Sequence, residues 1–141
     1  MAYLFDTDAI SEIWRKKPSR KYLGWLAEVG RDEQYTSAVV VGELFKGAYR
    51  SERKGHFLTV IEEEVLPRFT VLAFDTDVAR VYGQTRAALE SAGATVAEAD
   101  LQIASTALRH GLTMVTGNVR HFEKVRGLAI HDIRGERSST T

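Results

Sequence analysis

The chain opens with a short apolar run that ends in two carboxylates, Tyr3-Leu4-Phe5-Asp6-Thr7-Asp8. Apolar residues then recur at a spacing near 3.6, as Ala9-Ile10 and Ile13-Trp14. A short apolar run followed by this period predicts a buried strand and then a helix. Asp6 therefore lies at the carboxyl end of a predicted strand, where open α/β sheets bind their ligands. A carboxylate at this place either caps the helix or takes part in chemistry.

The same alternation of strand and helix continues along the chain. The predicted strands are residues 2–5, 34–37, 70–74, 112–115 and 128–130. The predicted helices run from about Thr7 to Lys17, Ser19 to Gly30, Ser37 to Arg53, Phe57 to Leu66, Asp75 to Gly93 and Ala97 to His110, and a short helix carries Phe122 and Val125. This alternation predicts an α/β fold with a mostly parallel sheet and helices on both faces. We expect one domain over residues 1–134 and a disordered polar tail over residues 135–141.

The composition is that of an ordinary soluble protein, with 44% apolar and 27% charged residues in a chain of 141. The sequence has no cysteine, which excludes disulfides and thiolate metal sites. Basic and acidic residues balance at 19 each, so the net charge neither supports nor excludes nucleic-acid binding. Because the sequence shows neither a leader nor a membrane-spanning stretch, we expect a cytoplasmic protein.

Two further carboxylates fall at positions that suggest chemistry. Asp100 shares a helix face with Ile103 and Ala104, so it is predicted to point inward, where carboxylates are normally paired or bound to a metal. The alternative is an acid that serves the dipole in the first helical turn. Glu43 lies in a helix with Gly42 and Gly47, whose small size suggests that a ligand or another backbone comes close. The alternative for Glu43 is a solvated position on the helix flank.

The strand over residues 112–115 delivers Thr116-Gly117-Asn118 to the same edge of the sheet as Asp6. These side chains can hold a water, cap the next helix or ligate a hard cation. Asp6, Glu43, Asp100 and Asn118 together form an oxygen-only ligand set, which favours Mg²⁺ or Mn²⁺ over zinc. The chemistry that follows is hydrolysis of a phosphodiester, in which the ion supplies an activated water and stabilises the developing charge.

Two basic clusters could hold a nucleic-acid backbone or could be ordinary solvated surface. They are Arg15-Lys16-Lys17 with Arg20-Lys21, and Arg50, Arg53 and Lys54. Arg120 and Lys124 are better placed, because they lie close to Asn118 in the sequence.

The order of these motifs resembles that of the PIN-domain ribonucleases, and within them the VapC toxins of bacterial toxin–antitoxin pairs. The resemblance covers about residues 2 to 131. The matching pieces are Leu4-Phe5-Asp6-Thr7-Asp8 with Ile10-Ser11-Glu12, then Val41-Gly42-Glu43-Leu44, then Asp100-Leu101-Gln102-Ile103-Ala104 with Ala107, and finally residues 110–118 with Phe122.

The resemblance implies a five-stranded parallel sheet and Mg²⁺- or Mn²⁺-dependent endonucleolytic cleavage of RNA. It also implies a homodimer that is inhibited by a cognate VapB-type antitoxin, whose C-terminal segment lies across the active-site groove. Asp6, Glu43 and Asp100 match the acids of the family, and Thr116 and Asn118 match its T-x-N element. On this basis Asp6 and Asp100 are expected to be the main metal ligands. Glu43 would bind directly or through water, and Asn118 would complete the shell or position the attacking water.

One repeat and one departure bear on this interpretation. Phe5-Asp6-Thr7-Asp8 recurs as Phe74-Asp75-Thr76-Asp77, again at a predicted strand-to-helix turn. The resemblance assigns Asp6 to the site and leaves Asp75 as a helix cap. His121 stands where many members of the family carry an acid, which predicts one metal ion, or weaker binding of a second.

Two other functions stay open at this point. The chain could be a non-catalytic binding module that keeps the fold as a scaffold, although all three acids are present. It could also be a metal-dependent hydrolase that acts on DNA or on small phosphates, because the metal site reads the phosphodiester and not the sugar.

Overall fold

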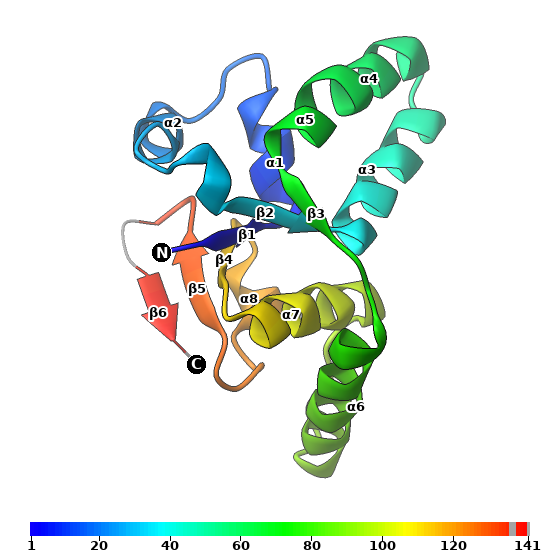
Figure 1. Cartoon of the computed structure of the whole chain (residues 1–141), viewed down its shortest axis with the longest axis vertical. Helices are drawn as coiled ribbons and strands as arrows, with labels where there is room; N and C mark the ends of the chain where they lie inside the picture. Colours follow the sequence, from blue (N-terminus) through cyan, green and yellow to red (C-terminus); the bar gives the residue numbers. More distant parts are fainter. Residues whose placement is uncertain (136–137, 141) are drawn as a thin grey trace.

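A computed structural model describes residues 1–135 and 138–140 of the chain (Figure 1). The strands are β1 (Tyr3–Phe5), β2 (Gln34–Ser37), β3 (Thr70–Leu72), β4 (Thr113–Thr116), β5 (Ala129–Asp132) and β6 (Ser138–Thr140). The helices are α1 (Thr7–Ile13), α2 (Arg20–Leu26), α3 (Ala38–Arg50), α4 (Lys54–Val60), α5 (Leu66–Arg68), α6 (Thr76–Ser91), α7 (Glu98–His110) and α8 (Val119–Phe122). A 3₁₀ turn (Arg31–Glu33) precedes β2, and a π-helical turn (Ile61–Val65) joins α4 to α5.

The strands form one sheet in the order β3-β2-β1-β4-β5-β6. The first five strands in this order are parallel, which confirms the predicted α/β sheet. β1 lies in the interior between β2 and β4, and Phe5 at its carboxyl end pairs with Val115. Since the parallel strands all end at the same edge, residues that follow β1, β2 and β4 are brought together there.

The tail predicted to be disordered differs in part from the structure. Residues 138–140 form β6, which pairs antiparallel to β5 at the edge of the sheet. Pairing at a sheet edge uses main-chain N–H and C=O groups and needs no apolar side chains, so a polar sequence can form it. The prediction for residues 136, 137 and 141 lies outside the described residues.

Helices cover both faces of the sheet, as predicted. Figure 1 shows α1 and α2 above the sheet and α6 and α7 below it. The core between these layers includes fully buried residues of the central strands and of α7. They are Leu4, Phe5, Met114 and Val115 from the strands and Leu101, Ile103, Ala104 and Ala107 from the helix. No helix within the described residues is long and apolar enough to cross a membrane.

The first helix begins at Thr7 as predicted but ends earlier than predicted. Its N-cap is Asp6, because the Asp6 carboxylate accepts a hydrogen bond from the Thr7 N–H. It ends at Ile13, four residues before the predicted end. The Glu12 carboxylate accepts hydrogen bonds from Arg15 and from the Ser19 N–H, and these contacts draw the chain back toward α1.

The helical segment after α3 begins earlier and ends later than predicted. α3 ends at Arg50 and α4 starts at Lys54, so Lys54 and Gly55 belong to α4 and only residues 51–53 separate the two helices. Pro67 was expected to end the helix, but it lies in the first turn of α5, where the missing N–H breaks no hydrogen bond. The predicted caps of two other helices are confirmed, since Ser37 accepts from the Val40 N–H and Asp75 accepts from the Val78 N–H.

Candidate active site

Asp6 is the buried centre of the candidate site. It follows β1, and its N–H continues the strand pairing by donating to the Val115 carbonyl at 2.9 Å. Only 5% of the residue is exposed. One carboxylate oxygen accepts from the Thr7 N–H at 2.8 Å, and the other accepts from the Thr116 hydroxyl at 3.0 Å. Asp6 therefore has both roles that the sequence left open, because it caps α1 and faces the other predicted site residues.

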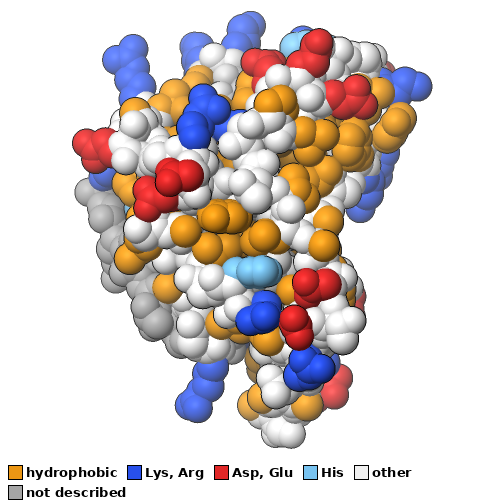
Figure 2. Space-filling view, viewed as in Figure 1, with side chains coloured by type: hydrophobic (Ala, Val, Ile, Leu, Met, Phe, Trp, Pro, Cys, Tyr) orange, Lys and Arg blue, Asp and Glu red, His pale blue; other side chains and the backbone are white. Residues whose placement is uncertain are grey.

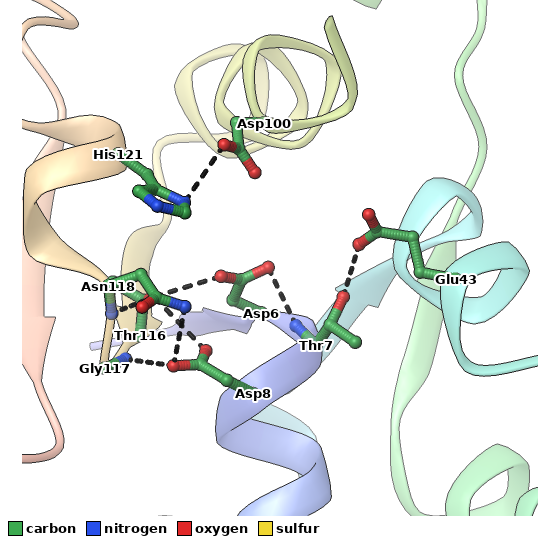
Figure 3. Close-up of polar contacts among 9 residues, drawn as sticks. All are labelled: Asp6, Thr7, Asp8, Glu43, Asp100, Thr116, Gly117, Asn118 and His121. Atoms are coloured by element: carbon green, nitrogen blue, oxygen red, sulfur yellow. Dashed lines mark hydrogen bonds and ion pairs between the residues drawn. The ribbon is translucent and has the colours of Figure 1, made fainter. Parts of the chain in front are cut away.

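Glu43 and Asp100 reach the same place from two helices. Figure 3 shows both side chains directed toward the space beside Asp6, Glu43 from α3 and Asp100 from α7. The Thr7 hydroxyl donates a short hydrogen bond to Glu43 Oε1. His121 Nδ1 lies 3.2 Å from Asp100 Oδ2, and the Asp100 side chain is only 19% exposed. The position facing inward that was predicted for Asp100 is thus confirmed.

The turn between β4 and α8 supplies the polar groups opposite Asp6. Thr116 is fully buried, and its hydroxyl accepts from the Asn118 N–H at 3.0 Å while it donates to Asp6. Asn118 is the N-cap residue of α8, but its side chain makes no capping hydrogen bond. Its amide nitrogen donates instead to Asp8 Oδ2 at 3.2 Å. The structure thus brings all five predicted site residues to one edge of the sheet.

Sequence reasoning missed Asp8, which was not among the predicted site residues. Its carboxylate contacts Thr116, Gly117 and Asn118, all more than 100 positions away in the sequence. The signal that could have suggested this role is its place two residues after Asp6, in a turn that faces the end of β4. The repeated tetrapeptide made this position uninformative, because Asp77 occupies the same place in the repeat and lies on a surface helix.

Burial and neighbouring negative charge raise the proton affinity of Asp6 and Asp100. Burial raises the pKa of Asp6 from 3.8 to about 7, with the neighbouring charge of Asp8 as the next cause and a smaller effect of Asp100. Burial also raises the pKa of Asp100, and the charges of Glu43 and Asp8 act in the same direction, while His121 opposes them. Within residues 1–135, no Lys or Arg forms an ion pair with Asp6, Asp8, Glu43 or Asp100.

The donor set fits a hard divalent cation, because it consists of buried and half-buried carboxylates with which no Lys or Arg within residues 1–135 forms an ion pair. In the described part of the chain, no three His, Asp or Glu side chains are arranged to hold a metal ion as they stand. Glu43 is directed to Thr7, and Asp100 to His121. Mg²⁺, however, usually takes only one or two carboxylates and keeps several waters, which Asp6 and Asp100 can satisfy.

A groove of about 790 Å³ adjoins the site between α1, α3 and α4. Thr7 and Glu43 line both the groove and the site, so the groove opens directly onto the carboxylates. Its other walls are mostly apolar, with four basic side chains, and include Ile10, Trp14, Leu44, Phe57, Val60, Ile61 and Val65 together with Arg15, Lys16, Arg53 and His56. Figure 2 shows hydrophobic side chains gathered over the α3 and α4 region of the surface.

The sequence of this chain is similar to those of a known protein family. The model of the PIN domain matches residues 3–128, which include every residue of the candidate site. This chain is a PIN domain.

Several relatives share this PIN domain over most of their length. VapC ribonuclease Y4jK of Sinorhizobium fredii is 35% identical over 125 residues, which are 85% of this chain and 89% of the relative. Toxin FitB of Neisseria gonorrhoeae is 35% identical over 124 residues, 84% of this chain and 89% of the relative. The crystal structure of FitAcB from Neisseria gonorrhoeae superposes with a TM-score of 0.88 at 32% identity and covers 95% of this chain and 99% of that one.

The raised pKa of Asp6 predicts how the stability of the metal-free PIN domain depends on pH. Between pH 3.8 and about 7 the folded protein keeps a proton on Asp6 that the unfolded chain has released. The Asp6 contribution to the free energy of unfolding is therefore full below about pH 4 and is lost as pH rises through about 7. We expect Asp6→Asn to remove this part of the pH dependence.

Urea unfolding in EDTA, at pH values from 4.5 to 8, measures this effect. The matched control is Asp75→Asn, which changes an exposed cap carboxylate at the same place in the repeated tetrapeptide. The same decline of stability with pH in wild type and Asp6→Asn would contradict the assignment to Asp6.

Proposed function

We propose that this PIN domain is a Mg²⁺- or Mn²⁺-dependent endoribonuclease that hydrolyses RNA phosphodiesters and acts as the toxin of a toxin–antitoxin pair. The observation that carries the proposal is the group of Asp6, Asp8, Glu43 and Asp100, which repel one another at a sheet edge and which no Lys or Arg within residues 1–135 neutralises. The names of two relatives, a VapC ribonuclease and a toxin, support the reaction and the role.

Asp6 and Asp100 would be the main ligands of the ion, with the Asn118 carbonyl oxygen beside them and Glu43 bound directly or through water. When bound, the ion supplies a Lewis acid that neutralises charge developing on the phosphate and makes water more nucleophilic. The Thr7 N–H and the Thr116 hydroxyl hold the Asp6 carboxylate in place before any ligand arrives. Asp6 must lose its proton to bind the ion, so metal affinity rises with pH toward about 7.

Cleavage of RNA tests the central proposal. Purified wild-type protein should cut a mixed cellular RNA pool at discrete sites with Mn²⁺ or Mg²⁺, and should not cut in EDTA. Asp6→Asn and Asp100→Asn should each lower the rate by at least about a hundredfold, because each removes a charge that binds the ion. Glu98→Gln is the control, since Glu98 lies in the same first turn of α7 as Asp100 but binds Arg86 and Tyr82.

The same assay separates the two rival functions. Cleavage of DNA and RNA of the same sequence at equal rates would favour the broader phosphodiesterase. A protein that binds Mn²⁺ and leaves every RNA intact would contradict the proposal, and a protein that neither cuts nor binds metal would favour the scaffold.

We also propose a single ion per chain. His121 lies where the family often has an acid, so position 121 supplies no carboxylate for a second ion. His121 also contacts Oδ2 of Asp100. Titration with Mn²⁺, followed by electron paramagnetic resonance, should give one tight site. His121→Asp supplies the missing acid and should add a second, weaker site. Two tight sites in the wild type would contradict this prediction.

A cognate antitoxin and a second copy of the chain are the proposed protein partners. The groove beside Glu43 has apolar walls and basic side chains, which suits the C-terminal segment of an antitoxin with apolar and acidic residues. Four of the five exposed large apolar side chains of the described residues, Tyr49, Phe57, Val71 and Phe74, lie within residues 49–74, and β3 is an edge strand. Such a surface suits a homodimer.

The product of a small open reading frame beside this gene should form a complex with the protein and inhibit its cleavage. Phe57→Glu places a charge on the groove wall and should weaken that complex at least tenfold, whereas Tyr49→Glu, on α3 outside the groove, should not. Light scattering after gel filtration should give the mass of a dimer. Equal weakening by both substitutions would place the antitoxin elsewhere.

A further inference from the structure

Asp8 connects the start of α1 to the turn after β4 through three hydrogen bonds. Its Oδ2 accepts from the Gly117 N–H at 2.8 Å and from Asn118 Nδ2 at 3.2 Å. Its Oδ1 lies 3.3 Å from the Thr116 hydroxyl. Figure 3 shows Asp8 below this turn, with the Asn118 amide nitrogen directed at it. The proposed metal ligands are Asp6, Asp100, Glu43 and Asn118, and Asp8 is not among them.

The contact with Asp8 decides which end of the Asn118 amide is available. A carboxylate only accepts hydrogen bonds, so it binds the NH₂ end of the amide and repels the carbonyl end. Asn118 Oδ1 is therefore turned away from Asp8, and it accepts no hydrogen bond within the described residues. A carbonyl oxygen that is left without a hydrogen bond in this way is a suitable ligand for a hard cation.

The turn is built to admit the Asp8 carboxylate. A Cβ atom at position 117 would lie 2.7 Å from Asp8 Oδ2 and 2.9 Å from Arg134 Nε, which is closer than real side chains approach. Any larger residue there would have to displace the Asp8 carboxylate and the Arg134 side chain. The Thr116 hydroxyl has one hydrogen and lies nearer to Asp6 than to Asp8, at 3.0 and 3.3 Å, so Asp6 is its main acceptor and its contact with Asp8 is the weaker one.

A role for Asp8 in the dipole of α1 does not explain these contacts. Asp77 occupies the same place in the first turn of α6, and its exposed carboxylate pairs with Arg80 and Arg109 at the surface. Asp8 makes no ion pair among residues 1–135, and every contact described for its carboxylate goes to the turn after β4. The same acid in the same local sequence thus makes different contacts at the two sites.

We infer that Asp8 is a positioning residue, which fixes Thr116-Gly117-Asn118 and turns the Asn118 carbonyl oxygen toward the ion. This inference rests on the proposed function, since Asn118 acts there as a metal ligand. It assigns Asp8 no contact with the ion or the RNA.

A double-mutant cycle of Asp8→Ala and Asn118→Ala tests the inference, with Asp77→Ala as the matched control. The readouts are the Kd for Mn²⁺ without RNA, by electron paramagnetic resonance, and the kcat and KM for RNA cleavage. Asp8→Ala should weaken Mn²⁺ binding by about ten- to a hundredfold, the usual effect of losing a partner that orients a ligand. It should lower kcat and leave KM nearly unchanged.

The cycle distinguishes positioning from a general structural role. In the Asn118→Ala background, Asp8→Ala should have little further effect on Mn²⁺ affinity, because its influence passes through Asn118. If Asp8→Ala does not fold, Asp8→Asn carries the test. The carbonyl oxygen of the introduced asparagine can still accept from the Gly117 N–H, so Asp8→Asn should weaken Mn²⁺ binding less than Asp8→Ala. This smaller effect should also vanish in the Asn118→Ala background. Asp77→Ala should leave both readouts unchanged.

Three results would overturn the inference. The inference would be refuted if Asp8→Ala left Mn²⁺ affinity unchanged. It would also be refuted if Asp8→Ala weakened Mn²⁺ binding as much in the Asn118→Ala background as in the wild type. Both results leave the proposed function standing, provided that the wild type binds Mn²⁺ and cuts RNA. A wild type that binds no Mn²⁺ would refute the proposed function and this inference together, so the two failures are distinguishable.

Discussion

The burial of the Asp6 carboxylate is the constraint on which the rest of the site depends. Asp6 follows the interior strand β1, so its backbone must stay in the sheet and its side chain cannot reach solvent. Two hydrogen bonds from Thr7 and Thr116 offset part of the cost of burying it. Burial raises the proton affinity of Asp6, and the like charges of Asp8 and Asp100 raise it further. The proposed divalent cation would offset this repulsion.

The parallel sheet explains why these acids meet although they are far apart in the sequence. β1 and β4 are neighbours and end at the same edge, which places Asp6 beside Thr116. β2 pairs with the other side of β1, and Ser37 at its end caps α3, which carries Glu43 toward Thr7. α7 contributes Asp100 over the same edge. Asp6 thus directly follows a strand, and Glu43 and Asp100 lie in helices that begin near the same edge of the sheet.

Much of this arrangement could be predicted from the sequence, because strand ends and helix starts are local signals. Asp6 and Thr116 follow apolar runs, and the apolar neighbours of Asp100 predict its inward direction. The role of Asp8 could not be predicted, since Asp6-Thr7-Asp8 and Asp75-Thr76-Asp77 are identical in sequence. The tertiary structure separates the roles of Asp8 and Asp77: the first stretch follows an interior strand and the second follows the edge strand β3. Likewise, no local pattern revealed β6, because strand pairing at an edge depends on β5 and not on its own side chains.

Diffraction from crystals soaked in Mn²⁺, recorded where manganese scatters anomalously, tests the central claim most directly, because it locates the ion itself. The account predicts an anomalous peak at the carboxyl edge of β1, bound by oxygens of Asp6 and Asp100 with the Asn118 carbonyl oxygen beside it. A well-ordered site without a peak, or a peak held only by residues away from Asp6, would contradict it.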